Sequence, residues 1–240
     1  MKAQRMMTPS KISFCTWNLN RADQLRQTLP QNLAMADRFE GEVEFCVLDL
    51  GSRDGSRELL ADLSRAEPRL VYRRLDGMPV HFARNYNAAH RLASGDVMVT
   101  LDADNWIGER FCDTLATLYR HFGDAFVVHA FDGDWFGGTC GRLAMSSRLF
   151  ERVGGYDESF EPVMYQDIDL RNRAVAAGGI LVSVRDASII GGAVRNSLDD
   201  RYREMDANVD AGRVMHRINR QRSRRRLRSG VYRVNVPGED

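Results

Sequence analysis

The stretch Asp96-Val97-Met98-Val99-Thr100-Leu101-Asp102-Ala103-Asp104 joins a short apolar run to two carboxylates. An apolar run of this length predicts a buried strand. Side chains two apart on a strand point to the same side, so Asp102 and Asp104 are expected to face one divalent cation. Carboxylate oxygens suit Mn²⁺ or Mg²⁺, and these ions usually complete their coordination with substrate phosphates. The stretch therefore predicts a metal and diphosphate site, although an isolated Asp-x-Asp is also typical of a surface turn.

Strand-like segments alternate with helical patterns on both sides of this stretch. The expected strands are residues 11–17, 42–48, 70–75, 97–101, 125–131, 142–146 and 180–184. The expected helices are residues 24–38 with Asp23 as the cap, 56–64, 81–93, 108–121, 147–153 and 166–177. Such alternation predicts an α/β fold with a Rossmann-like, mostly parallel sheet flanked by helices. Ligands bind such sheets at the carboxyl ends of the strands, where Asp49, Asp102 and Asp104 follow their predicted strands.

The composition is typical of a soluble globular protein, with 43% hydrophobic and 28% charged residues among 240. That length suits one sizeable domain. No apolar run approaches the roughly 20 residues that span a bilayer, and residues 1–11 lack the apolar core of a signal peptide. We therefore expect a cytoplasmic protein. Because no Cys-x-x-Cys pair occurs, the four cysteines are predicted to be reduced thiols, mostly in the core: Cys15, Cys46, Cys112 and Cys140.

Positive charge is concentrated near the C-terminus. Residues 213–240 hold nine arginines against two carboxylates, in a chain whose formal net charge is +1. Apolar residues continue at helical spacing to Ile218, which predicts a packed helix over residues 197–219. Beyond it the apolar stripe is lost, so residues 220–240 are expected to form a solvated Arg-rich tail that attracts an anionic acceptor or the inner face of a membrane. Nucleic acid is not expected, because no aromatic stacking platform accompanies the arginines.

Further motifs surround the acid pair in a definite order. They are Thr16-Trp17-Asn18-Leu19-Asn20-Arg21, Asp49-Leu50-Gly51-Ser52-Arg53-Asp54-Gly55-Ser56, Ala83-Arg84-Asn85, Ala93-Ser94-Gly95-Asp96, Arg142-Leu143-Ala144-Met145, Val153-Gly154-Gly155-Tyr156-Asp157-Glu158 and Gln166-Asp167-Ile168-Asp169-Leu170. In this order they resemble the motifs of inverting glycosyltransferases of family 2, which have the GT-A fold. The resemblance implies an N-terminal tail at residues 1–10 and a GT-A domain at residues 11–196, followed by the packed helix and the tail.

The same resemblance implies a donor site. The donor-binding residues would be Thr16, Asn18, Arg21, Asp49, Arg84 and Asp102, with Thr16 and Asp49 at the nucleotide base. Asp104 would bind the metal directly, and Asp102 would lie near both the ribose and the metal. Two structural alternatives stay open. Asp49 also suits an Asx-turn ahead of residues 51–56, and Arg84 also suits a solvated helix charge.

An acceptor side is implied as well. Its residues would be Trp135, Gly155, Tyr156 and Gln166, and Asp167 would be the catalytic base that takes the proton of the attacking hydroxyl. Asp167 begins a predicted helix, where the field of the N-terminus is expected to keep it ionised. The alternative is that Asp167 merely favours the helix start.

The chain also departs from the family pattern. Gln166 stands where the family usually has Glu, Leu50 replaces a second carboxylate, and residues 186–195 lack the late histidine that often completes the metal site. These departures predict modest metal affinity. They also keep open a catalytically weak nucleotide-sugar-binding or glycan-binding protein. A sugar nucleotidyltransferase is a further alternative, but it should have a Gly-rich loop after its first strand, and residues 16–21 contain no glycine.

The function that the sequence predicts is metal-assisted transfer of a sugar from a nucleotide diphosphate to an acceptor hydroxyl, with inversion. The expected donor is a uridine diphosphate sugar. The expected acceptor is a glycan, a lipid-linked compound or a small molecule, and the expected cofactor is Mn²⁺ or Mg²⁺.

Overall fold

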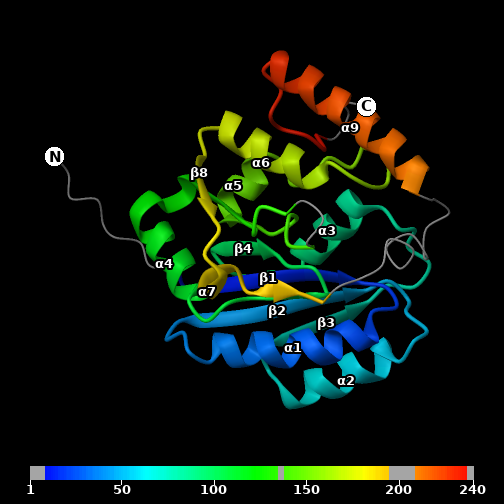
Figure 1. Ribbon diagram of the computed structural model, residues 1–240, viewed down its shortest axis with the longest axis vertical. Coiled ribbons are helices and arrows are strands. Elements are labelled where there is room, and N and C mark those ends of the chain that lie inside the picture. The colour runs from blue at the N-terminus through cyan, green and yellow to red at the C-terminus, as the bar shows by residue number, and fades with distance from the viewer. Residues whose placement is uncertain (1–8, 135–137, 195–208, 237–240) are drawn as a thin grey trace.

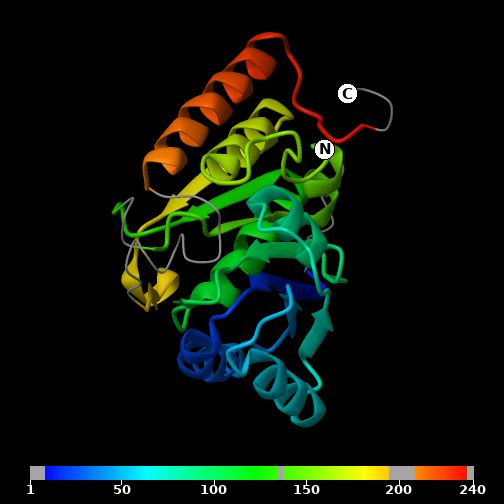
Figure 2. The ribbon, with the colours of Figure 1, turned by 90° about the vertical axis from the view of Figure 1, so that its right-hand side faces the viewer.

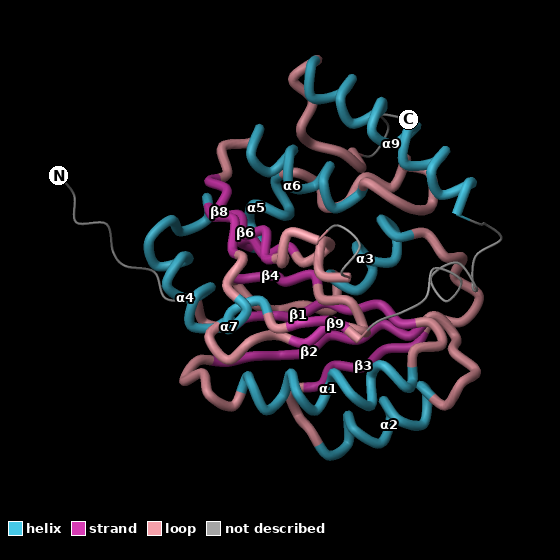
Figure 3. Tube along the Cα trace, viewed as in Figure 1, coloured by secondary structure: helices cyan, strands magenta, loops and turns pink. Residues whose placement is uncertain are grey.

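Strands and helices alternate along the chain, as Figure 3 shows by colour. The computed structural model describes residues 9–134, 138–194 and 209–236. The strands are β1 (Lys11–Asn18), β2 (Glu42–Asp49), β3 (Leu70–Arg74), β4 (Val97–Thr100), β5 (Asn105–Trp106), β6 (Phe126–Ala130), β7 (Leu143–Ser146), β8 (Ile180–Val184) and β9 (Gly192–Ala193). The helices are α1 (Ala22–Ala36), α2 (Ser56–Ala66), α3 (Phe82–His90), α4 (Phe111–Phe122), the 3₁₀ turn η1 (Gly123–Ala125), α5 (Ser147–Arg152), α6 (Gln166–Ala176), α7 (Ala187–Ile190) and α9 (Val209–Arg228). The short elements β5, α7 and β9 were not predicted.

The central sheet has the strand order β3-β2-β1-β4-β7-β6-β8. All neighbouring pairs are parallel except those that β7 forms with β4 and with β6. Six strands therefore share one direction and β7 alone opposes them. The predicted α/β class with a mostly parallel sheet is confirmed. Strands β5 and β9 form a separate antiparallel pair.

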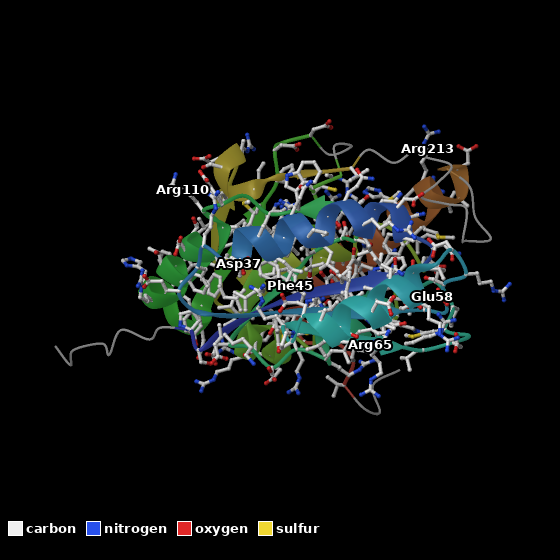
Figure 4. All side chains as sticks on the ribbon, turned by 90° about the horizontal axis from the view of Figure 1, so that it is seen from below. Asp37, Phe45, Glu58, Arg65, Arg110 and Arg213 are labelled. Atoms are coloured by element: carbon white, nitrogen blue, oxygen red, sulfur yellow. The ribbon has the colours of Figure 1, made fainter. Side chains whose placement is uncertain are left out.

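Helices cover both faces of the sheet (Figures 1 and 2). Successive strand residues point to opposite faces, so Phe14 of β1 joins the core under α1, α2 and α4, whereas Cys15 packs on the side of α3. Met98 of β4 belongs to the cluster of α5 and α6. Figure 4, seen from below, shows α1 and α2 lying across the first face with Phe45 of β2 between them.

The start of α1 is stabilised from a distant loop. The carboxylate of Asp54, just before α2, accepts a hydrogen bond from the Ala22 N–H at 2.7 Å. Asp23 lies in the first turn and forms an ion pair with Arg26 instead. The prediction of Asp23 as the cap is wrong, because a carboxylate far away in the sequence satisfies the first N–H group.

The C-terminal helix α9 lies beside α6 (Figures 1 and 2). It runs without a break to Arg228, and within it Ser223 is fully buried. After the helix, Val234 is buried, and its N–H donates to the carbonyl of Val153 at 3.1 Å. Most described residues from 220 onward are exposed, as expected, but the helix continues to Arg228 and the segment is anchored at Ser223 and Val234. Residues 1–8, 197–208 and 237–240, on which other expectations depended, lie outside the described residues.

Among the described helices, none combines the length and the apolar character needed to cross a membrane. The four cysteines are thiols, and three of them are buried, as their spacing and surroundings predicted.

A buried ion pair within α6 also anchors this helix to the loop after α5. Arg173 and Asp169 are both buried and their side chains meet at 2.6 Å. Arg173 also donates to the carbonyl oxygens of Val153 at 2.9 Å and Gly155 at 2.8 Å. Arg173→Leu should lower the free energy of unfolding by about 3–5 kcal/mol, because Asp169 is left buried without its partner. Urea unfolding checks this, and exposed Arg152→Leu on α5 is the control, with an expected change within about 0.5 kcal/mol.

Candidate functional site

A cavity of about 220 Å³ opens where β1 and β4 end, beside the first turn of α6. Its polar lining includes Arg21, Asp102, Asp104, Gln166 and Asp167. Trp17, Phe82 and Tyr86 form an aromatic wall, in which the rings of Trp17 and Phe82 lie 5.3 Å apart between centroids. Five residues that the sequence motifs singled out for the site thus meet in one cavity, and the aromatic wall is added by the fold.

Asp102 and Asp104 both line this cavity, as predicted, but β4 ends at Thr100, both lie between β4 and β5, and Ala103 lines the cavity with them. The hydroxyl of Tyr86 on α3 donates a hydrogen bond to Oδ1 of Asp102. Burial raises the pKa of Asp102 to about 7, and the charge of Asp104 adds to the rise. Burial and the neighbouring carboxylate together outweigh the hydrogen bond from Tyr86 and the charge of Arg142, which lower this pKa.

Arg142 supplies positive charge to the acid pair from inside the protein. It precedes β7 and is 2% exposed. Its Nη2 donates to Oδ1 of Asn105 at 2.6 Å, and Nδ2 of Asn105 donates to Oδ1 of Asp104 at 2.7 Å. Burial lowers the pKa of Arg142 to about 10, while the charges of Asp102 and Asp104 oppose that change. The relay through Asn105 fixes the Asp104 carboxylate before any ligand binds.

The acid pair fits a divalent cation that is shared with a ligand. Within residues 9–134, 138–194 and 209–236, no three His, Cys, Asp or Glu side chains cluster closely enough to enclose a metal. Mg²⁺ and similar ions are commonly held by one or two carboxylates, with the remaining ligands taken from phosphates and water. The two oxygen donors and the excess of negative charge at Asp102 and Asp104 match that kind of site.

A third carboxylate reaches the cavity from α6. Oδ1 of Asp167, the second residue of the helix, accepts a hydrogen bond from the Ile168 N–H at 2.8 Å. Burial nevertheless raises the pKa of Asp167, so the helix N-terminus does not dominate as expected. A raised pKa makes this carboxylate a stronger base than an exposed aspartate. Beside it, Oε1 of buried Gln166 has no hydrogen-bond partner among the described residues.

The chain enters α6 through a strained turn. Met164 and Tyr165, which line the cavity, each have a φ of 73°. Left-handed backbone costs a residue other than glycine about 1–3 kcal/mol and persists only where the surroundings enforce it. Nothing in the sequence pattern predicted this turn.

Asn18 and Asp49 lie at the ends of β1 and β2 in a buried polar cluster. Nδ2 of Asn18 donates to Oδ1 of Asp49 at 3.0 Å, and Nη1 of Arg74 donates to Oδ2 of Asp49 at 2.7 Å. The Ser52 N–H also donates to Asp49, at 3.3 Å, which matches the Asx-turn that the sequence left open. No sequence motif pointed to Arg74. A ligand that binds Asp49 would have to share a carboxylate already engaged by these donors.

Two other predicted donor residues lie off the cavity. Thr16 is buried, and its hydroxyl donates to the carbonyl of Leu101 at 2.7 Å. Arg84 is exposed on α3 and does not line the cavity, as expected for a solvated helix charge.

Two residues that were predicted to contact the acceptor are instead buried in the protein. Tyr156 is fully buried, and its hydroxyl lies 2.7 Å from that of Thr100. Gly155 has a φ of 69°, and a Cβ there would meet Oδ1 of Asn87 at 2.6 Å, so only glycine suits the position. Neither residue lines the cavity, which corrects their predicted contact with the acceptor. Trp135 lies outside the described residues.

Comparison with known proteins assigns the chain to a family. Glycosyl transferase family 2 matches residues 13–161, more than half of the chain. The chain belongs to glycosyl transferase family 2. The predicted family, and with it the glycosyltransferase class, is confirmed. The matched region of this family 2 chain contains Asp102 and Asp104 and ends before Asp167.

Individual relatives support the same fold. Abequosyltransferase RfbV of Salmonella typhimurium is 28% identical over 123 residues, which are 50% of this chain and 35% of that protein. The mannosyltransferase PcManGT from Pyrobaculum calidifontis, solved with GDP-Man and Mn²⁺, has a TM-score of 0.64 and 18% identity, over 90% of this chain and 65% of that one. S. aureus TarS 1-349 with UDP-GlcNAc has a TM-score of 0.62 and 15% identity, over 78% of this chain and 59% of that one. These likenesses confirm the GT-A fold, and the family 2 chain spans less than two thirds of each protein.

Asp104→Ala should abolish Mn²⁺-dependent binding of a nucleoside diphosphate and leave the fold intact, because Asp104 lies at a strand end rather than in the core. Tyr86→Phe should weaken the same binding by about 10–100-fold, because Asp102 loses the hydroxyl that orients it. Isothermal titration with and without Mn²⁺ measures both effects. An affinity unchanged by Asp104→Ala would remove the metal from this site.

Proposed function

We propose that this protein transfers a sugar from a nucleotide diphosphate to an acceptor hydroxyl, with inversion at the anomeric carbon. The observation that carries the proposal is the meeting of three carboxylates in one cavity, two after β4 and one at the start of α6. Transfer needs stabilisation of a leaving diphosphate and removal of a proton from the acceptor. Asp102 and Asp104 suit the first task, and Asp167 suits the second.

Asp102 and Asp104 would hold the donor side in place. A divalent cation bound there would supply positive charge where negative charge develops on the departing diphosphate. The protein fixes the two carboxylates in advance, through Tyr86 at Asp102 and through Asn105 at Asp104. Preorganised groups do not have to move during the reaction, so their full effect reaches the transition state. Arg21, also on the cavity, is a cation suited to a phosphate oxygen.

Asp167 would act on the acceptor. Its carboxylate would take the hydroxyl proton as the acceptor oxygen bonds to the sugar C1 and the bond from C1 to the diphosphate oxygen breaks. Attack from the side opposite the leaving group inverts the configuration. Gln166, which lines the same cavity, would contact the acceptor beside Asp167.

For the donor we propose a uridine diphosphate sugar, since the motifs at residues 16–21 and 49–56 resemble those that contact this base in the family. Neighbours in complex with GDP-Man and with UDP-GlcNAc make other bases the necessary comparison. A thermal-shift panel of nucleoside diphosphates, with and without Mn²⁺, tests the choice, because a ligand at 100 times its Kd stabilises the folded state by about 2.7 kcal/mol. A shift with guanosine diphosphate alone would overturn the uridine assignment, and no shift at all would contradict donor binding.

A catalytically weak protein that binds nucleotide sugars or glycans is the second candidate. It is favoured by Gln166 and Leu50, which stand where the family usually has carboxylates, and Leu50 is buried in the core. Donor binding without hydrolysis or transfer would support this candidate. The family match gives no support to the sugar nucleotidyltransferase.

Asp167→Asn should leave donor affinity unchanged and lower kcat by roughly 10²-fold or more, because proton removal belongs to the transition state. Burial raises the pKa of Asp167. The base is therefore lost as pH falls through a value above the approximately 3.9 of an exposed aspartate, and kcat of the unmodified enzyme should fall there too. Profiles of kcat against pH check this fall at low pH, which should be absent from Asp167→Asn. Retained turnover in the variant, or a product that keeps the donor's anomeric configuration in NMR spectra, would refute the assignment.

We also propose that α9 binds an anionic membrane surface. Five exposed arginines spaced four, three, four and four residues apart form an arginine face on this helix: Arg213, Arg217, Arg220, Arg224 and Arg228. Figure 4 labels Arg213 on this helix. Arginines near an anionic bilayer contribute about 1 kcal/mol each. The location that goes with this proposal is cytoplasmic, at the inner face of the membrane.

The double variant Arg217→Glu and Arg220→Glu should lower binding to phosphatidylserine-containing vesicles by roughly tenfold or more. Co-sedimentation measures the binding, which should weaken as salt shortens the Debye length toward about 8 Å. Arg57→Glu with Arg65→Glu on α2 makes the same charge change away from the arginine face and should have little effect. Binding that is equal for both double variants, or that persists on phosphatidylcholine alone, would refute the membrane contact.

A further inference from the structure

The loop before α6 brings three consecutive residues, Val163, Met164 and Tyr165, to the cavity and then continues into Gln166 and Asp167. Met164 and Tyr165 both have left-handed backbone, with a φ of 73°. Since Tyr165 immediately precedes the helix, its conformation sets the direction in which the first turn of α6 leaves the loop. The position of Asp167 therefore depends on whatever holds residues 161–165 in this shape.

Asn219 of α9 holds this loop. It is fully buried, and its Nδ2 donates to the carbonyl oxygens of Val163 at 3.0 Å and Met164 at 2.8 Å, with that of Glu161 at 3.1 Å. Its Oδ1 accepts a hydrogen bond from the Glu161 N–H at 2.8 Å. One short side chain thus satisfies donors and acceptors of this loop, to which α3 adds one further bond, from the Phe82 N–H to the carbonyl of Pro162 at 2.8 Å. An amide is suited to this task because it carries two N–H donors and a carbonyl acceptor on one group.

Two neighbouring residues on the same face of α9 contact the chain just before this loop and at its last residue. Arg226, seven residues after Asn219, forms an ion pair with Asp157, which lies four residues before Glu161. His216, three residues before Asn219, meets the ring of Tyr165 edge-on, with centroids 5.3 Å apart. Figure 2 shows α9 along the side of α6, so α9 packs against the helix that carries Asp167.

We propose that Asn219 is a positioning residue for the reaction, which it serves by holding the left-handed turn that aims Asp167 into the cavity. This inference rests on the proposed function of Asp167. Asn219 does not line the cavity, so it acts through the loop and not on a substrate. The C-terminal helix is by this account a part of the catalytic machinery that the family match, which ends at residue 161, does not include.

Hydrogen exchange tests the hold directly, without an assay of activity. Asn219→Leu keeps a similar volume but cannot hydrogen-bond, and amides of residues 161–170 should exchange at least tenfold faster, while those of the central sheet stay unchanged. Gln221→Leu is the control, because it removes an exposed amide from the same helix. If Asn219→Leu fails to fold, Asn219→Ser, which keeps a small polar side chain, replaces it. Unchanged exchange in residues 161–170 would overturn the proposal.

Turnover separates positioning from general damage. Asn219→Leu should lower kcat by roughly 10–100-fold while the donor KM stays within twofold. The reason is that the loop leads directly into the catalytic base Asp167 and does not carry Asp102 or Asp104. Glycine adopts a positive φ without strain, so Met164→Gly should restore much of the lost kcat when combined with Asn219→Leu and compared with Met164→Gly alone. A loss of kcat that glycine does not relieve, or a matching rise in the donor KM, would overturn the proposal. Absence of transfer by the unmodified protein would contradict the proposed function, and the exchange result would still decide whether Asn219 holds the loop.

Discussion

The burial of β4 is the constraint on which the site depends. This strand bonds to β1 on one side and to β7 on the other, and all four of its residues are buried. A carboxylate within it would lose its hydration without gaining a partner, which is strongly unfavourable. Acidic residues can therefore occur only after the end of β4. There they lie at the edge of the sheet where the other parallel strands also have their carboxyl ends. The sheet both excludes charge from its interior and collects it at one edge.

Burial also decides the protonation behaviour of the site. It is the largest influence on the pKa of Asp102, Asp167 and Arg142, raising that of the two acids and lowering that of the arginine. The field at a helix N-terminus contributes about 0.3–1 kcal/mol, and the burial of Asp167 outweighs it. This comparison explains why Asp167 has a raised pKa even though it accepts a hydrogen bond in the first turn of α6. The helix field had been overestimated because sequence alone does not show how deeply the first turn is buried.

Much of the fold and part of the site could be predicted from local pattern. Strand periodicity placed Asp102 and Asp104 at one edge of the sheet, because parallel strands bring their ends to that edge, and the family resemblance added Gln166 and Asp167 to the site. Tyr86, Arg142 and Asn219 were missed, since each acts through contacts that only the fold creates. Asn219, for example, bonds to a loop 58 residues away in sequence.

The motif around Tyr156 shows a different limit of sequence reasoning. Its resemblance to an acceptor-side motif gave no information on which way the ring points, and the ring is stacked on Tyr86 in the core with centroids 5.0 Å apart. Asn87 fixes the same segment by accepting from the Tyr156 N–H at 2.8 Å. In this chain the motif therefore packs behind the cavity rather than facing into it.

The reversed direction of β7 determines where the chain can change during evolution. Because β6 and β7 are antiparallel neighbours, the connection from Ala130 to Leu143 both leaves and re-enters the sheet at the edge that carries the acid pair. Gly138, Cys140 and Gly141, within that connection, line the cavity. Insertions or replacements there would reshape the cavity wall without shifting the register of any strand. The fold thus keeps the acid pair beside a connection that can be replaced, an arrangement through which one scaffold can acquire new acceptor preferences.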